Sequence, residues 1–149
     1  MSRREPPYDR LGVFKELSDV PDGRRLHHLA PAYEGRDTWG DYRATVELSD
    51  RMSVEWDRFA RRWKEHMDDR GRHHALARPD DVETWSAELV ERFSVDRAYQ
   101  HWNVIEGFYD WLLWHTEHQH TYNPFHMAVV DPERGARQIW NRKMEKAND

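Results

Sequence analysis

The sequence contains no cysteine, which excludes disulfide bonds and thiolate metal sites. Only four of its 23 basic residues are lysines, so arginine supplies almost all of the positive charge. No apolar stretch approaches the ~20 residues that a membrane-spanning helix needs, and the first residues have no apolar core of the kind found in secretory signals. We therefore expect a cytoplasmic protein without a membrane partner.

The composition indicates a single folded domain. A chain of 149 residues can bury a core of its own, and eight tryptophans supply much of the expected core volume. Scarce lysine and abundant aspartate are typical of a salt-adapted cytoplasm, and equally of a GC-rich genome. The net charge of −5 argues against a general polyanion binder, because phosphate binding needs a positive potential.

The charge is unevenly distributed along the chain. Residues 51–78 carry eight basic and five acidic side chains, whereas residues 80–96 carry six acidic side chains and one arginine, Arg92. A nucleic-acid footprint, if the chain has one, should therefore centre on the first of these stretches.

The spacing of apolar residues predicts an all-α fold. No segment alternates with the period of a strand, whereas helical spacing recurs in several segments. We expect a four- to five-helix bundle over residues 37–130, preceded by an irregular N-terminal arm over residues 1–36 and followed by a C-terminal helix and tail over residues 131–149. The arm is expected to have one helical turn near residues 11–17. The predicted helices cover residues 38–48, 53–69, 79–92, 94–116 and 132–145.

Residues that favour helix ends set these boundaries. Asp37 and Ser53 are predicted N-caps, and Pro79 suits a first turn. Gly71 is expected to stop the helix that precedes it. Asn123-Pro124 is expected to end the packed part of the domain.

Three stretches resemble, in order, the core-binding (SAM-like N-terminal) domain of phage-integrase-type tyrosine recombinases. Residues 37–42, DTWGDY, are similar to the opening helix of that domain, and residues 53–59 to the start of its second helix. Residues 94–112, SVDRAYQHWNVIEGFYDWL, are similar to its Thr-Val-x-x-Tyr-Leu-x-x-Leu-Arg-x-Phe-Tyr-x-Trp-Leu helix, with Glu106 where the family often has arginine. The pattern is closest to haloarchaeal integrase-like proteins, and it implies a SAM-like bundle.

The residues that cut DNA in this family are missing. Its catalytic domain supplies an arginine, a lysine, a His-x-x-Arg motif and a nucleophilic tyrosine. No histidine of this chain is followed by arginine three residues later, and too few residues follow Pro124 for a second domain. The resemblance therefore implies a module that binds duplex DNA without cutting it. Such a module would be an accessory or regulatory protein of site-specific recombination or of a mobile element, or the non-catalytic half of a split recombinase.

The resemblance also implies which side chains meet DNA, because the second and fourth helices of that fold present their N-terminal halves to the duplex. The alternative for these positions is a solvated charged face, which most helices have. The residues implied for phosphate contacts are Arg58, Arg61, Arg62 and Lys64, with Arg72 and His73 in the turn that follows. The residues implied for base edges are Arg97, Gln100, His101 and Asn103.

Two other functions remain possible for this sequence: binding of a protein partner and binding of a metal ion. The same helical fold could bind a protein partner through its acidic surface and an exposed tryptophan, of which Trp111, Trp114 and Trp140 are the candidates. That partner would be a recombinase catalytic subunit, or a second copy bound through the C-terminal helix. A metal site at the histidines of residues 115–120 lacks the HExxH pattern, and a polar helix end explains them better, so we expect no metal and no cofactor.

Overall fold

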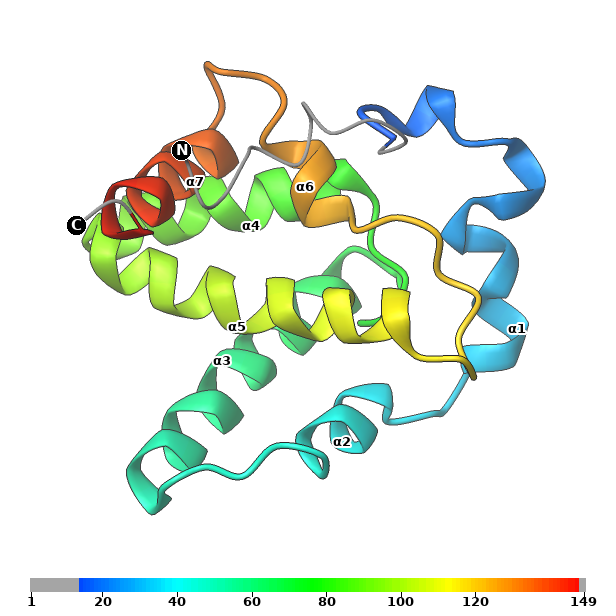
Figure 1. The fold of residues 1–149 in the computed structure, drawn as a ribbon, viewed down its shortest axis with the longest axis horizontal. Helices are drawn as coiled ribbons and strands as arrows, with labels where there is room; N and C mark the ends of the chain where they lie inside the picture. Colours follow the sequence, from blue (N-terminus) through cyan, green and yellow to red (C-terminus); the bar gives the residue numbers. More distant parts are fainter. Residues whose placement is uncertain (1–13, 148–149) are drawn as a thin grey trace.

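The computed structural model describes residues 14–147, which contain seven α-helices and no strand (Figure 1). This confirms the predicted all-α class. The turn expected near residues 11–17 falls partly outside the described residues, and a 3-10 helix begins at its end, at Leu17. No helix of the described part is both long enough and apolar enough to cross a membrane.

The described part of the arm packs on the rest of the molecule. Tyr33 is buried, and the backbone N–H of the buried Leu26 donates a hydrogen bond to the hydroxyl of Tyr122 over 2.8 Å. The arm therefore contributes side chains to the common core. Its elements are the 3-10 helices Leu17–Asp19, Asp22–Arg24 and Leu26–Leu29, followed by α1 (Ala30–Tyr33).

The next two helices differ from their predicted bounds at one end each. α2 (Thr38–Arg43) has the predicted N-cap, Asp37, but it ends before residue 48. α3 (Asp50–Asp69) begins before residue 53 because Ser49 caps it in place of Ser53, with a hydroxyl that accepts from the N–H of Met52. Gly71 follows its C-cap with a φ of 74°, a left-handed conformation that glycine adopts without strain.

The predictions for the following pair of helices are close to the structure. α4 (Pro79–Arg92) has the predicted bounds, with proline in its first turn. α5 (Val95–Trp114) follows after Phe93 and Ser94, and the Ser94 hydroxyl caps it by accepting from the N–H of Arg97. The two helices thus meet at a tight corner.

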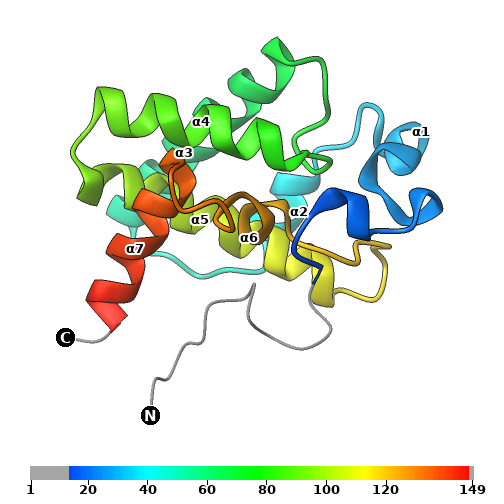
Figure 2. The same ribbon diagram turned by 90° about the horizontal axis from the view of Figure 1, so that it is seen from above.

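The packed part continues beyond Asn123, so the prediction that it ends at Asn123-Pro124 is wrong. α6 (Pro124–Ala128) buries Phe125, and α7 (Gly135–Ala147) lies against α4 and α5 (Figures 1 and 2). The apolar residues Ile139 and Trp140 of α7 are buried there. This stripe, which was a candidate for self-association, is therefore already covered.

The core is mainly aromatic. The ring centroids of Trp63 and Trp85 lie 5.0 Å apart at a steep angle, and Phe125 lies 5.3 Å from Trp63 and 5.2 Å from Trp102. Tilted and edge-to-face contacts of this kind are favoured by aromatic quadrupoles. The tryptophans thus serve mainly as core residues.

The loop between α3 and α4, residues 70–78, buries Ala75, Leu76 and Ala77 and is held by side chains of the helices around it. The backbone carbonyl of His74 accepts hydrogen bonds from the Trp63 indole N–H and from the Tyr109 hydroxyl, each over 2.8 Å. The Tyr109 oxygen in turn accepts from the N–H of Ala77 over 2.9 Å. These contacts satisfy backbone groups that would otherwise be buried without partners.

A fully buried carboxylate, Asp81, closes the same loop from α4. It accepts hydrogen bonds from the guanidinium groups of Arg70 and Arg72 and from the backbone N–H of Arg78. Burial alone would raise the pKa of the Asp81 carboxyl, but the hydrogen bonds from Arg72 and Arg70 outweigh burial and lower it. Asp81 is therefore ionised at neutral pH.

Replacing Asp81 with asparagine should destabilise the protein by about 3 kcal/mol, because two arginines would lose a buried counter-charge. Urea unfolding followed by circular dichroism measures this effect. Glu88→Gln, at a half-exposed position on the same helix, is the matched control and should change stability little. Equal effects of the two substitutions would contradict the structural role of Asp81.

Several buried histidines are neutral at physiological pH. Burial lowers the pKa of His74 to about 3 and the pKa values of His101 and His120 to about 4. His120 is additionally held in place by donating its Nε2–H to the carbonyl of Ala75 over 2.7 Å. Protonation would place a charge on a ring that burial largely removes from solvent.

The folded state should therefore lose stability as the pH falls below 6.5. Because the folded-state pKa values lie below the unfolded value, the unfolded chain takes up protons first, and stability is complete only above pH 6.5. Between pH 7 and pH 5 we expect a loss of ~2–5 kcal/mol, measured by urea unfolding at each pH. A stability that stays constant over this interval would contradict the neutral burial of these histidines.

Candidate nucleic-acid interface

The N-terminal halves of α3 and α5 lie side by side and form a groove of about 640 Å³. α3 contributes the aromatic rings of Trp56 and Phe59 to its lining. α5 contributes Arg97, Gln100 and Asn103, which are three of the four residues predicted to approach base edges. Gln100 is exposed and Asn103 is half-buried, so both are accessible from solvent.

Five arginines gather beside this groove, and of these only Arg97 is among the residues that line it. Arg62 of α3 lies close enough to Arg58, Arg61, Arg92 and Arg97 that their positive charges, after burial, are the main causes that lower its pKa. The cluster joins three predicted phosphate-contacting residues to Arg97. Arg92, which ends α4, was not among the predicted site residues.

Aromatic faces support the guanidinium groups of this cluster. The guanidinium carbons of Arg62 and Arg92 both lie 5.2 Å from the centroid of the Phe93 ring, and that of Arg97 lies 5.0 Å from the centroid of Phe59. Cation–π contacts of this kind hold a charge in place. The same guanidinium groups also donate hydrogen bonds within the protein, Arg62 to His101, Arg92 to Glu88, and Arg97 to Glu55 and Gln100. We call this set the arginine cluster: Arg58, Arg61, Arg62, Arg92 and Arg97.

Acidic side chains partly offset the arginine cluster. The carboxylate of Glu55 accepts a hydrogen bond from Arg97 over 2.8 Å and lies 3.4 Å from Arg58. Asp96, in the first turn of α5, is paired instead with α7, through Arg142 at 2.7 Å and Lys146 at 3.4 Å. The C-terminal helix thus neutralises an acidic residue next to the groove.

The prediction that His101 approaches base edges is wrong, because its side chain is completely buried. Its Nδ1 donates to the carbonyl of Arg97 over 2.8 Å, so its Nε2 must accept, and Arg62 donates to it over 2.6 Å. His101 therefore positions Arg62. The sequence contained a signal for this role, since His101 falls on the helical stripe of Ala98 and Ile105.

Three other predicted contacts lie outside the groove and have structural partners. Lys64 pairs with Asp37 at 2.8 Å, which ties α3 to the start of α2. Arg72 binds the buried Asp81, and the ring of His73 donates to the carbonyl of Arg36 over 2.7 Å. The phosphate contacts predicted for Lys64, Arg72 and His73 therefore do not belong to the groove, and their side chains stabilise the fold.

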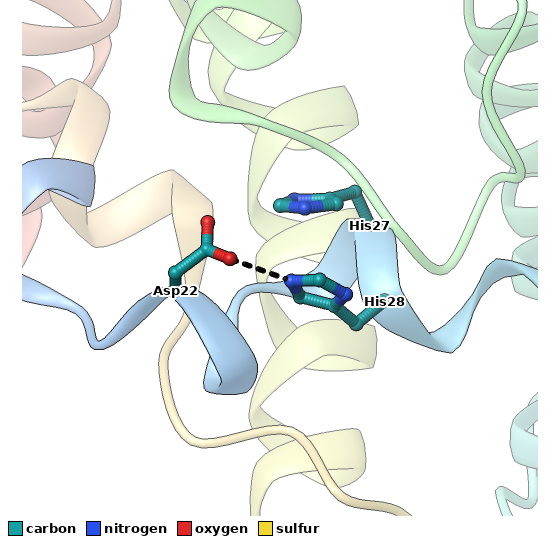
Figure 3. A group of neighbouring side chains, drawn as sticks. All are labelled: Asp22, His27 and His28. Atoms are coloured by element: carbon teal, nitrogen blue, oxygen red, sulfur yellow. Dashed lines mark hydrogen bonds and ion pairs between the residues drawn. The ribbon is translucent and has the colours of Figure 1, made fainter.

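The histidines of residues 115–120 have separate partners. His118 bonds to the hydroxyl of Tyr33, whereas His120 bonds to a backbone carbonyl of the α3–α4 loop. Potential metal ligands converge at two other places among residues 14–147. One is the exposed group shown in Figure 3. There a carboxylate oxygen of Asp22 lies 3.1 Å from Nε2 of His28, and the ring of His27 is tilted against the ring of His28 with centroids 4.1 Å apart. The other is Glu106, Asp110 and His126.

Comparison with known proteins gives no relative on which to base a function. No protein-family model, no curated protein and no solved structure matches this chain. The interpretation of the groove therefore depends on its own geometry and charge, together with the motif resemblance described above.

Proposed function

We propose that this chain is a duplex-DNA-binding module related to the core-binding domain of tyrosine recombinases. The observation that carries the proposal is the arginine cluster, in which α3, α4 and α5 place five arginines near one another beside the groove, with Phe59 and Phe93 supporting three of them. Like charges are brought together in this way where an anionic ligand offsets them. The phosphates of DNA are such a ligand.

The groove supplies both kinds of contact that sequence-selective binding needs. The arginine cluster can bind phosphates on either side of an inserted helix, which orients the protein on the duplex. Asn103 can pair with adenine through two hydrogen bonds. Gln100 can do the same, and Arg97 can pair with guanine, when they exchange the hydrogen bonds that Arg97 donates to Gln100 and Glu55. The accessible face of α5 would therefore lie in the major groove, with α3 beside it along the backbone.

In this role the chain would not cleave DNA. Tyr122, the last tyrosine of the sequence, is buried, and its hydroxyl accepts the Leu26 N–H, so it is not presented to a phosphate. A catalytic subunit would have to supply the chemistry. We therefore propose an accessory or regulatory part in site-specific recombination or in a mobile element.

A second candidate function is supported by one observation. Trp114, at the end of α5, exposes 82% of its surface and is thus the most exposed of the three candidate tryptophans. An exposed tryptophan of this size is typical of a protein-binding site. A protein-interaction module with the same fold is therefore the alternative to DNA binding.

Reversing two charges of the arginine cluster should abolish most DNA binding. For the double variant Arg58→Glu/Arg62→Glu we expect at least ~10-fold weaker binding to duplex DNA, because phosphate contacts are lost. The slope of log affinity against log salt should fall by ~0.9 for each lost contact. Fluorescence anisotropy across a salt titration measures both quantities.

The matched control reverses two exposed arginines outside the groove, Arg24→Glu/Arg134→Glu, which changes the net charge by the same amount. It should bind DNA almost as the unsubstituted protein does. Equal weakening in both variants would show a response to net charge alone, and binding that is unchanged in the first variant would reject the groove. Circular dichroism confirms that each variant is folded.

Removing the two amides should affect selectivity more than affinity. In the variant Gln100→Ala/Asn103→Ala we expect preference among duplex sequences to fall by ~1–3 kcal/mol for each amide, because bidentate base contacts are lost. The salt slope should stay the same, since no phosphate contact changes. Selection from a random duplex library measures the preference, and an unaltered selected site would contradict base reading by these side chains.

A further inference from the structure

Three potential metal ligands converge where α5, α6 and α7 meet. Glu106 and Asp110 are one helical turn apart and therefore project from the same face of α5, and His126 reaches them from α6. The Nε2 atom of His126 lies 2.8 Å from a carboxylate oxygen of Glu106 and 3.9 Å from one of Asp110. All three ligand atoms lie within 4.8 Å of one another.

Contacts to neighbouring residues hold the two carboxylates in this arrangement. The side-chain amide of Asn123 donates to Asp110 over 3.0 Å and also to the backbone carbonyl of Glu106. Lys143 of α7 binds Oε1 of Glu106, which leaves Oε2 directed at His126. Such outer contacts are what orient the ligands of metal sites in proteins.

The cluster is also accessible. Glu106 is almost completely buried, but the side chain of Asp110 is 44% exposed, so an ion can enter from solvent on that side. This arrangement is distinct from the exposed group of Figure 3, whose three residues have no buried member.

We propose that Glu106, Asp110 and His126 form a binding site for a divalent transition-metal ion, Zn²⁺ in the first place. Two carboxylate oxygens and one imidazole nitrogen suit Zn²⁺ at bond lengths of ~2.0–2.2 Å. A tetrahedral ion with such bonds separates its ligand atoms by roughly 3.4 Å. This value lies between the two distances to His126, so shifts of a fraction of an ångström admit the ion.

A bound ion would join α5 to α6 and would act beside the Lys143 contact that joins α5 to α7. Its role is therefore the stabilisation of the C-terminal half of the molecule. The site is separate from the DNA-binding groove, because its residues are not among those that line the groove. The inference does not depend on the proposed function.

Isothermal titration calorimetry with ZnCl₂ tests the proposal on the full chain, purified without a histidine tag and stripped with a chelator. We expect one ion per chain and a rise in Tm on adding Zn²⁺, because an ion that binds only the folded state stabilises it. Co²⁺ in place of Zn²⁺ should give the visible absorption of a tetrahedral site with nitrogen and oxygen ligands. Absence of this stoichiometric binding would overturn the proposal.

Variants locate the site. Asp110→Asn/His126→Gln should weaken Zn²⁺ binding at least tenfold and should remove the Co²⁺ absorption. The matched control, Asp22→Asn/His28→Gln, changes the exposed group of Figure 3 and should leave both unchanged. Binding that is lost in the control instead would place the ion at the exposed group and reject the proposal.

If the variant Asp110→Asn/His126→Gln does not fold, nuclear magnetic resonance of the unsubstituted protein can still locate the ion. The ¹⁵N chemical shifts of the histidine rings in the unsubstituted protein should change on Zn²⁺ addition at Nε2 of His126. A spectrum in which the His126 ring stays unaffected, while another histidine responds, would contradict the assignment.

Discussion

The backbone carbonyl of His74 connects α3 to α5 and adds to the direct contacts between these two helices. It accepts hydrogen bonds from Trp63 on one helix and from Tyr109 on the other, so the buried loop acts as the connection between them. Loops are rarely buried, because their backbone groups then need partners inside the protein. Here side chains from three helices provide those partners, with Asp81 completing the set. The loop thereby helps to hold together the two helices whose N-terminal halves line the groove.

Aromatic residues that contact the core also support the arginine cluster. Phe59 and Phe93 pack on the buried ring of His101 on one side and support guanidinium groups on the other. The arginine cluster is consequently held by packing as well as by ion pairs. Its geometry should therefore be less sensitive to salt than that of an ordinary charged surface.

Much of the helical fold could be predicted from the sequence, whereas the roles of several polar residues could not. α4 was predicted correctly because Pro79 begins it and its apolar stripe has regular spacing. Ser49 and Ser53 are equally good caps in the sequence, and only tertiary packing selects the first. The five-residue α6 is too short to show a helical period. In the groove, Gln100 and Asn103 are accessible, and their contact with DNA stays a prediction. The burial of His101 could have been predicted from its place on the stripe of Ala98 and Ile105, but its partner Arg62 comes from another helix and leaves no local pattern.

The pairing of α7 with the first turn of α5 has a consequence for how this protein could be controlled. Arg142 and Lys146 mask the negative charge of Asp96 next to the groove. Acetylation of Lys146 would remove one of these two positive charges, leave Asp96 paired with Arg142 alone, and make the region beside the groove less attractive to an anion. α7 lines no part of the groove, yet its two basic residues change the electrostatic potential beside the groove.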